Sequence, residues 1–210
     1  MYTETKLKTT VALEKPRHQV GLLGGNFNPV HNGHLVVAQA VLETLGLERI
    51  DFLPSFLPPH VDVKKTIAAT NRLEMLDLAT RDNPNFTIED VEIQRLGKSY
   101  TIDTMRQLNA SHPDTDYYFI IGGDMVEYLP KWKDIDELMT IVRFVGVNRP
   151  HYERLSPYPI IYVDVPQLEI SSSLIRKKIQ LGQSIRYLLP DSVVHYIQKE
   201  ELYKDDRNFL

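Results

Sequence analysis

The sequence predicts an α/β protein with a Rossmann-like, doubly wound, mostly parallel sheet, helices on both faces and a helical C-terminal segment. Three observations lead to this fold class. Apolar runs of strand length alternate with longer helix-like runs, as in successive βαβ units. Clusters of glycine and polar residues follow several of these apolar runs, as they do at the carboxyl edge of a parallel sheet. Hydrophobic residues make up 42% of the 210 positions, which is enough for a substantial core.

The first half of the chain contains three expected strands. An apolar run over 20–23 leads into a glycine-rich turn and a helix over 35–42, with Gly46 where a helix C-terminal glycine belongs. A short strand is expected over 49–54, and a proline-rich loop follows it over 55–65. Asn71 and Glu74 have the spacing of a capping box in a helix over 71–79. Alternating apolar and acidic residues predict a strand over 86–93.

The second half repeats this alternation of helices and strands. A helix over 101–108 precedes an apolar strand over 117–123, which ends in two glycines like the first strand. A short helix over 134–140 leads to strands over 142–147 and 159–165. Two helices, over 172–181 and 191–199, form the C-terminal segment, and Gly182 follows the first of them.

The chain is expected to form a single domain over 19–210, preceded by a flexible N-terminal extension over 1–18. The extension contains lysine and glutamate and has no long apolar core, so it does not resemble a signal peptide. No apolar run approaches the ~18 residues that a membrane span needs. We therefore expect a cytoplasmic protein with no membrane partner, and the absence of cysteine fits a reducing compartment.

The overall charge excludes some classes of partner. The formal net charge is −4, from 24 basic and 28 acidic residues, so no general attraction to nucleic acid is expected. The lack of cysteine also removes disulfides, thiolate metal sites and cysteine nucleophiles. An anionic ligand must therefore be held by a local cluster of donors.

The stretch over 24–34, with the sequence GGNFNPVHNGH, is the first candidate for such a cluster. Gly24 and Gly25 have no Cβ, so an anion can approach their backbone closely. A helix that begins near Gly33 directs its first N–H groups and the positive end of its dipole at the turn, where phosphate binds favourably. His31 and His34 add two imidazoles to this anion site.

These two histidines allow three interpretations. They could be structural residues bonded by the backbone. They could bind a metal, although no third histidine, carboxylate or cysteine lies at a convincing local spacing. They could donate hydrogen bonds to phosphate oxygens and stabilise charge that develops on a bridging oxygen. The neighbouring glycines favour the third interpretation, with no metal held by the protein itself.

Two other phosphate-binding motifs are incomplete. Gly97-Lys98-Ser99 resembles the end of a P-loop, but Glu92 stands where the first glycine of that motif is required. The dinucleotide-binding fingerprint breaks after Gly25, where Asn28 and Pro29 enter the turn. A P-loop hydrolase and a standard Rossmann dehydrogenase are therefore disfavoured.

A second candidate anion site opens the helix over 172–181. Ser171, Ser172 and Ser173 can cap this helix while their hydroxyl and N–H groups face a phosphate. Arg176, one turn further on, can reach the same anion with its two-pronged guanidinium. The alternative is an ordinary capped helix with a surface arginine.

Trp132, the single tryptophan, and Asp124 are further candidates. Trp132 could belong to the core, but Lys131 and Lys133 beside it favour a surface position, where its ring can stack on a flat heteroaromatic ring. Asp124 follows the second pair of glycines and could be no more than a turn residue.

These residues are similar to the signatures of the nucleotidyltransferase superfamily. The run over 24–34 resembles its His-x-Gly-His signature, and the run over 170–176, ISSSLIR, resembles its Ile-Ser-Ser/Thr-x-x-Ile-Arg signature. Within the superfamily the chain resembles the bacterial nicotinate mononucleotide adenylyltransferases over residues 20–203. The segments that carry this closer resemblance are 58–60 (PPH), 99–104 (SYTIDT), 121–124 (IGGD), 128–132 (YLPKW) and 148–150 (NRP).

The resemblance implies an activity, which is transfer of the adenylyl group of ATP to nicotinate mononucleotide in NAD biosynthesis. The products are nicotinate adenine dinucleotide and pyrophosphate. It also implies Mg²⁺ carried with ATP, and it leaves open a homo-oligomer. The acceptor phosphate is already an anionic nucleophile, so catalysis should come from orientation and charge stabilisation rather than from a general base.

The resemblance also implies roles for individual residues, with His31, His34 and Arg176 as the catalytic set. The implied ATP-binding set is Gly24, Gly25, Asn26, Phe27, His31, Gly33, His34, Ile170, Ser171, Ser172 and Arg176. The implied set for nicotinate mononucleotide is Asn26, Thr101, Asp124, Tyr128, Lys131, Trp132 and Arg149. Trp132 would stack on the nicotinate ring and Asp124 would bind the sugar. The sequence departs from the family at Val61, where a basic residue is common.

Two rival functions remain at this point. One is an adenylyl- or cytidylyltransferase of the same superfamily that acts on another acceptor, such as phosphopantetheine, although the regions of Trp132 and Thr101 disfavour it. The other is a non-catalytic sensor that only binds a dinucleotide. A pyrophosphate-release assay with each acceptor separates these possibilities.

Overall fold

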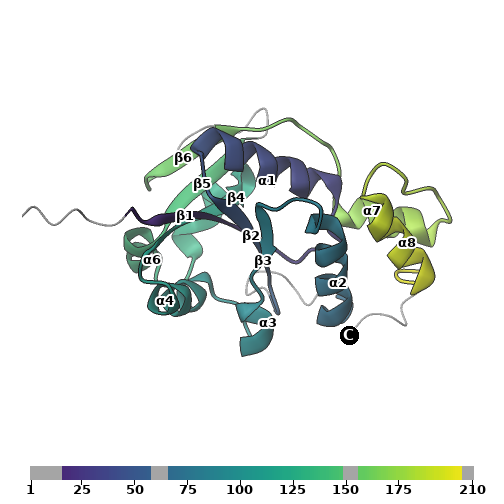
Figure 1. The fold of residues 1–210 in the computed structure, drawn as a ribbon, viewed down its shortest axis with the longest axis horizontal. Helices are drawn as coiled ribbons and strands as arrows, with labels where there is room; N and C mark the ends of the chain where they lie inside the picture. The colour runs from purple at the N-terminus through teal and green to yellow at the C-terminus, as the bar shows by residue number, and fades with distance from the viewer. Residues whose placement is uncertain (1–15, 58–65, 149–155, 205–210) are drawn as a thin grey trace, which may run out of the picture.

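The structure is a computed structural model that describes residues 16–57, 66–148 and 156–204 (Figure 1). Its six strands form one parallel sheet in the order β3-β2-β1-β4-β5-β6. Their bounds are β1 His18–Gly25, β2 Arg49–Pro54, β3 Phe86–Ile88, β4 Thr115–Gly122, β5 Arg143–Asn148 and β6 Ile160–Asp164. This arrangement confirms the predicted fold class.

The strand order reverses between β1 and β4. These two strands pair in register from His18 opposite Thr115 to Leu23 opposite Ile120, although the first crossover from β1 leads to β2 on the other side. Chain connections leave β1 and β4 in opposite directions along the sheet, so a crevice opens beyond their carboxyl ends. This is the position at which a ligand site is expected.

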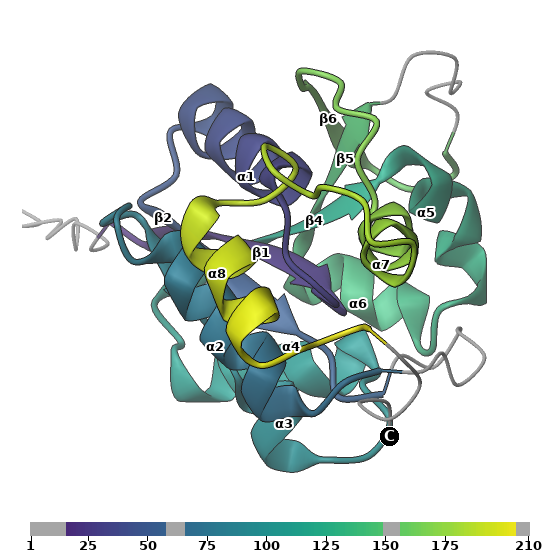
Figure 2. The same cartoon turned by 90° about the vertical axis from the view of Figure 1, so that its right-hand side faces the viewer.

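Helices cover both faces of the sheet, as Figure 1 shows for α1 on one side and α4 and α6 on the other. Their bounds are α1 Asn32–Leu45, α2 Ala69–Thr80, α3 Val91–Arg95, α4 Thr101–Ser111, α5 Gly123–Tyr128, α6 Ile135–Ile141, α7 Ser172–Gln180 and α8 Asp191–Lys199, with the 3-10 helix η1 at Leu129–Lys131. Figure 2 shows α7 and α8 beyond the carboxyl edge of the sheet. These two helices form the predicted C-terminal helical segment.

The core consists of two hydrophobic clusters, one on each face. In β1 the side chains of Val20 and Leu22 belong to one cluster and that of Leu23 to the other, because successive residues of a strand point to opposite faces. The first cluster also contains buried residues of α4 and α6, and the second contains buried residues of α1, α2 and α8. The sheet is therefore buried on both sides, as parallel sheets require.

Several predicted boundaries are confirmed. The ranges 49–54 and 191–199 coincide with β2 and α8. Gly46 follows α1 with a φ of 61°, which is the left-handed conformation that favours glycine at a helix C-terminus.

The strand predicted over 86–93 is wrong beyond Ile88. Residues 91–95 form α3, in which the adjacent residues Val91 and Glu92 are both buried. A strand would point these two side chains to opposite faces, whereas one turn of helix can bury both. The alternating pattern there was therefore not a sign of strand structure.

The capping box predicted from Asn71 and Glu74 is also wrong. The helix α2 begins at Ala69 with Ala68 as its N-cap, so Asn71 lies inside the first turn. Its Oδ1 accepts a hydrogen bond from the hydroxyl of Tyr196, with 2.9 Å between the oxygens, and this bond joins α2 to α8. The strand expected over 117–123 ends one residue earlier, because Gly122 is the last residue of β4 and Gly123 begins α5.

Parts of the remaining predictions lie outside the described residues. These parts are residues 1–15 of the expected extension and the segment 58–65, which contains His60, Val61, Lys64 and Lys65. Arg17, just before β1, donates hydrogen bonds to the carbonyl oxygens of Pro113 and Thr115. The division of the chain at residue 18 stays a prediction.

No helix within the described ranges is long and apolar enough to cross a membrane.

Candidate active site

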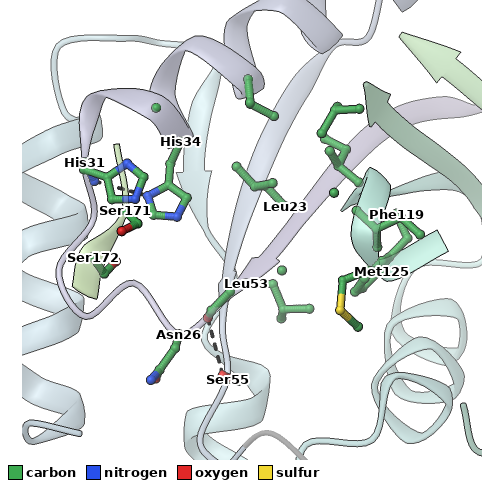
Figure 3. Close-up of a pocket in the computed structure, with 18 of the residues that line it drawn as sticks. Leu23, Asn26, His31, His34, Leu53, Ser55, Phe119, Met125, Ser171 and Ser172 are labelled. Atoms are coloured by element: carbon green, nitrogen blue, oxygen red, sulfur yellow. Dashed lines mark hydrogen bonds between the residues drawn. The ribbon is translucent and has the colours of Figure 1, made fainter. Parts of the chain in front are cut away.

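A cavity of about 570 Å³ opens at the carboxyl ends of β1 and β4, where the strand order reverses. Its volume lies in the range of ~300–1,000 Å³ that is usual for small-molecule sites. In Figure 3, His31, His34, Ser171 and Ser172 lie on one side of the cavity, and Phe119 and Met125 lie across from them. We call His31, His34, Ser171 and Ser172 the histidine end, and Thr101, Phe119, Trp132 and Lys133 the tryptophan end.

Most of the predicted site residues line this one cavity. They are Gly24, Gly25, Asn26, His31, Gly33, His34, Thr101, Trp132, Ile170, Ser171 and Ser172. Phe27, Tyr128, Lys131 and Arg176 are described but do not line it. The side chain of Asp124 and the whole of Arg149 lie outside the described part of the chain.

The two histidines form a compact pair at the start of α1. Their rings are stacked, with 3.7 Å between the centroids and 25° between the planes. The backbone N–H of His31 donates to Nδ1 of His34 across 3.2 Å. Since this Nδ1 accepts a hydrogen bond, the neutral ring of His34 carries its proton on Nε2. Phe27, which is buried, contacts the His34 ring edge-on at 5.0 Å between centroids and so supports it from behind.

Burial keeps both imidazoles neutral at pH 7. It lowers the pKa of His31 to about 4. Burial, and secondly the proximity of His31, holds the pKa of His34 well below its ordinary value. The histidine end therefore offers neutral N–H donors to an incoming anion.

Three buried polar atoms in the cavity wall have no hydrogen-bond partner among the described residues. They are Oδ1 of Asn26, Nδ1 of His31 and Nε1 of Trp132. Buried polar atoms in folded proteins are nearly always paired, and each exception calls for an explanation. The residues that carry these atoms line one cavity and include both of its ends.

The turn before α1 differs in one respect from the prediction. The N–H of Asn32 donates to the carbonyl oxygen of Leu188 at 3.0 Å, so this helix-initial donor is not free for an anion. A side chain at Gly33 would place its Cβ 3.0 Å from Nδ1 of His31. A larger residue at this position would therefore press on the ring of His31.

The start of α7 is hydrogen-bonded to the same turn. Ser171 caps α7 by accepting a hydrogen bond from the N–H of Leu174 at 3.2 Å. The hydroxyl of Ser172 donates to the carbonyl oxygen of Pro29 at 2.8 Å, and Nη1 of Arg176 donates to that of Asn28 at 2.7 Å. The two candidate anion sites therefore meet in space, although they are about 140 residues apart in the sequence. Arg176 lies behind this junction and not in the cavity wall.

The tryptophan end is aromatic. The ring of Trp132 is partly buried and contacts the rings of Phe119 and Phe144 edge-on, at 5.9 and 5.7 Å between centroids. Lys133 lines the cavity, with its ammonium 3.1 Å from a carboxylate oxygen of Asp103. An aromatic surface with a cation beside it suits a flat, negatively charged ring.

Sequence reasoning chose Lys131 at this end and missed Lys133. The ammonium of Lys131 lies 4.7 Å from the ring centroid of Tyr128, and Tyr128 is itself 52% exposed. The 3-10 helix η1 ends at Lys131, and the chain is extended at Trp132. This change of backbone direction decides which lysine faces the cavity, and the sequence carried no clear signal of it.

Glu92 and Ser99 are two further cavity residues, and neither belongs to the site predicted from the sequence. Both are buried. Oε1 of Glu92 accepts a hydrogen bond from the hydroxyl of Thr104 at 2.7 Å, and Oγ of Ser99 accepts one from the N–H of Phe56 at 3.0 Å. Burial raises the pKa of Glu92. Ser99 belongs to the SYTIDT segment, and the resemblance of that segment to the family was the one indication in the sequence that Ser99 lies near the site.

Comparison with known proteins gives a consistent result. The family model described as "Cytidylyltransferase-like" matches residues 22–178. A protein of Enterococcus faecalis named "Probable nicotinate-nucleotide adenylyltransferase" is 61% identical over 190 residues, which cover 90% of this chain and 87% of that protein. One of the same name from Lactiplantibacillus plantarum is 52% identical over 204 residues, which cover 97% of each chain.

Solved structures agree on the fold. The nicotinic acid mononucleotide adenylyltransferase of Plasmodium falciparum, complexed with NaAD, superposes with a TM-score of 0.75. The match covers 89% of this chain and 98% of that one at 19% sequence identity. A second structure of that enzyme, complexed with APC, gives a TM-score of 0.74. At this identity the likeness demonstrates the shared Rossmann-like fold.

Proposed function

Since the chain belongs to the cytidylyltransferase-like family and, within it, to the nicotinate-nucleotide adenylyltransferases, we infer that it transfers the adenylyl group of ATP to nicotinate mononucleotide. The products are nicotinate adenine dinucleotide and pyrophosphate, in the biosynthesis of NAD. The observation that carries this inference is a cavity with neutral histidine donors at one end and an aromatic wall with a lysine at the other.

The reaction needs no covalent intermediate. An oxygen of the acceptor phosphate attacks the α-phosphorus of ATP, and the bond from that phosphorus to the bridging oxygen of pyrophosphate breaks. The oxygen that leaves gains negative charge, which a fixed N–H donor can stabilise. We assign this task to the Nε2–H of His34, with His31 as its neighbour on the triphosphate. The hydrogen bond from His31 to Nδ1 of His34 supports the assignment, because it fixes the tautomer that donates.

Ser172 and Arg176 are proposed to bind the β- and γ-phosphates. In the free protein the hydroxyl of Ser172 donates to the carbonyl oxygen of Pro29, and Nη1 of Arg176 donates to that of Asn28. The hydroxyl of Ser172 has one proton to donate, so it must exchange its carbonyl partner for a phosphate oxygen, whereas the guanidinium of Arg176 has further N–H donors and can keep its bond to Asn28. The proposed ATP site further comprises Gly24, Gly25, Asn26, Phe27, Gly33, Ile170 and Ser171.

Trp132 is proposed to stack on the nicotinate ring of the acceptor. Thr101 and Asn26, which also line the cavity, are suited to its polar groups. Asp124, Tyr128, Lys131 and Arg149 remain proposed acceptor residues. For Tyr128 and Lys131 this requires a movement toward the cavity, because neither lines it in the free protein.

We propose Mg²⁺, carried by ATP, as the cofactor. Within the described residues, no group of three or more His, Asp or Glu side chains is placed to hold a metal ion. The described cavity wall offers imidazole and hydroxyl groups and the carboxylate of Glu92, which fits a cation coordinated mainly by substrate oxygens and water. Such a cation would neutralise charge on the triphosphate. We further propose a cytoplasmic location, no nucleic-acid partner, and a homo-oligomeric state that is left open.

A pyrophosphate-release assay tests the function directly. The purified protein is incubated with ATP and Mg²⁺ and with one acceptor: nicotinate mononucleotide, nicotinamide mononucleotide or phosphopantetheine. We expect the fastest release with nicotinate mononucleotide. Faster release with phosphopantetheine would assign the chain to another acceptor class, and binding of the dinucleotide without any release would make it a sensor.

A further inference from the structure

Arg72, on α2, carries a buried positive charge and has no role in the reaction proposed above. Only 1% of the residue is exposed. Its Nη1 donates to the carbonyl oxygens of Asn26 and Ser55, at 2.9 and 2.8 Å. Its Nε is buried and has no hydrogen-bond partner, and no carboxylate pairs with it in the part of the chain that the structure describes. An unpaired buried cation is costly, so its retention calls for an explanation.

This charge lies directly behind the cavity. Asn26 and Ser55, whose carbonyl oxygens it binds, both line the cavity and follow the neighbouring strands β1 and β2 (Figure 3). The N–H of Ser55 also donates to the carbonyl oxygen of Gly25 at 2.9 Å. The guanidinium of Arg72 therefore clamps together the ends of two strands at the point where the glycine-rich turn begins.

A second cation contacts the same turn. The guanidinium of Arg176 is partly buried, and it contacts the carbonyl oxygen of Asn28 and the hydroxyl of Ser173. Burial lowers the pKa of Arg72 and of Arg176, but guanidinium groups keep their proton in proteins. The segment 26–28 is thus flanked by two positive charges in a chain whose formal net charge is −4.

No carboxylate forms an ion pair with Arg72 or Arg176 among the described residues. The group that interacts electrostatically with both arginines is the phenol of Tyr203, whose hydroxyl donates to Oδ1 of Asn28 at 2.8 Å. Burial raises the pKa of this phenol, so it stays neutral at pH 7. An anion that enters the cavity beside the segment 26–28 would provide the missing negative charge.

We propose that Arg72 is a positioning residue for the polyphosphate of the substrate. It holds the segment 26–28 against the end of β2, and together with Arg176 it makes this wall of the cavity electropositive. It acts through the loop and does not touch the ligand. The proposal rests on the proposed function, because it takes the triphosphate of ATP and the released pyrophosphate as the ligands.

The test compares two substitutions at this position. Arg72→Gln removes the charge and Arg72→Lys keeps it. Arg81→Gln is the matched control, because Arg81 lies just after the same helix, is exposed and pairs only with Asp77 among the described residues. The measurements are the affinity for pyrophosphate with Mg²⁺, by calorimetry, and the KM values for ATP and for nicotinate mononucleotide.

For Arg72→Gln we expect about tenfold weaker pyrophosphate binding and a similar rise in the KM for ATP, with the KM for the acceptor changed less than about twofold. Arg72→Lys should stay within about threefold of the unsubstituted protein, and Arg81→Gln should match it. A purely structural role would lower thermal stability in both Arg72 variants and leave the pyrophosphate affinity of the folded protein unchanged. That result would overturn the proposal.

A measurement on the unsubstituted protein covers the case in which Arg72→Gln does not fold. The Nε–H resonance of Arg72, assigned by its loss in Arg72→Lys, is followed by NMR during titration with pyrophosphate and Mg²⁺. A shift that saturates with the ligand supports the proposal, and an unchanged resonance contradicts it. An unsubstituted protein that binds pyrophosphate but does not release it from ATP and acceptor would refute the proposed function and leave this inference standing.

Discussion

At the histidine end of the cavity, the imidazoles of His31 and His34 are stacked and neutral, and that of His34 is hydrogen-bonded to the turn. At the tryptophan end, Trp132 and Lys133 follow a short 3-10 helix. The first end is assembled from one contiguous stretch of sequence and the start of α7. The second draws on α4, β4 and the segment after η1. The first is suited to fixing a reacting phosphate and the second to selecting an acceptor.

This comparison makes a kinetic prediction. Substitutions at the histidine end should mainly lower turnover, because their contacts strengthen as charge develops on the departing oxygen. Substitutions at the tryptophan end should mainly raise the KM for nicotinate mononucleotide. Stacking on the nicotinate ring contributes the same free energy in the bound ground state and in the transition state, so its loss weakens binding without slowing the chemical step.

The largest effect is expected for His34→Ala. Loss of the Nε2–H donor should lower turnover at saturating substrates about 100-fold and change the KM for nicotinate mononucleotide less than twofold. Pyrophosphate release under steady-state conditions provides the measurement. His195→Ala, an exposed histidine on α8, is the control and should retain full activity. Full activity of His34→Ala would remove His34 from the mechanism.

The neutral histidines also predict a pH dependence of stability. The folded protein resists protonating His31 until the pH approaches about 4, whereas the unfolded chain takes up that proton near pH 6.5. Stability is therefore lost as the pH falls from 7 to 5, by about 2 kcal/mol for one fully resistant imidazole.

Urea unfolding at pH 7 and pH 5 measures this effect. The loss should be smaller in His34→Gln than in the unsubstituted protein, because the pKa of His34 is also lowered by burial. Carboxylates, including Glu92 with its raised pKa, titrate in both proteins and cancel in the comparison. An equal loss in the two proteins would mean that His34 is protonated in the folded state.

At the tryptophan end, Trp132→Ala should raise the KM for nicotinate mononucleotide at least tenfold, because stacking on an aromatic side chain contributes about 1–3 kcal/mol. The KM for ATP should change little. Trp132 also packs against Phe119 and Phe144, so Trp132→Phe serves as the conservative variant and should recover most of the affinity. If Trp132→Ala raised the KM for ATP as much as the KM for nicotinate mononucleotide, the two ends of the cavity would not bind different substrates.

The smallest effect is expected for Lys133→Met. The ammonium is partly exposed and already paired with Asp103, so its attraction for the nicotinate carboxylate is screened. The preference for nicotinate over nicotinamide mononucleotide should fall about threefold. Lys131→Met is the matched comparison, and a larger loss of preference in that variant would return the role to Lys131.

The sequence predicted the two ends to different degrees, for physical reasons. His31, His34 and Gly33 lie in one short stretch, and the strand, turn and helix around them follow from local patterns. Ser171 and Ser172 were found in the same way. The contact between these segments arises only in three dimensions, as in the bond from Ser172 to Pro29.

Residues at the other end depended on backbone geometry that the sequence does not reveal. Lys133 faces the cavity because η1 ends at Lys131. Glu92 is in the wall because residues 91–95 form a helix and not a strand. Arg72, which is not among the site residues predicted from the sequence, is buried and binds two carbonyl oxygens. Burial of a charged side chain is set by the tertiary fold and leaves little trace in local pattern.

A crystal structure of the complex with nicotinate adenine dinucleotide tests the central claim most directly. The account predicts the phosphates of the dinucleotide within hydrogen-bonding distance of His31 or His34, and the nicotinate ring stacked on Trp132. A dinucleotide in the reverse orientation, or one bound outside this cavity, would contradict the division of the site into a histidine end and a tryptophan end.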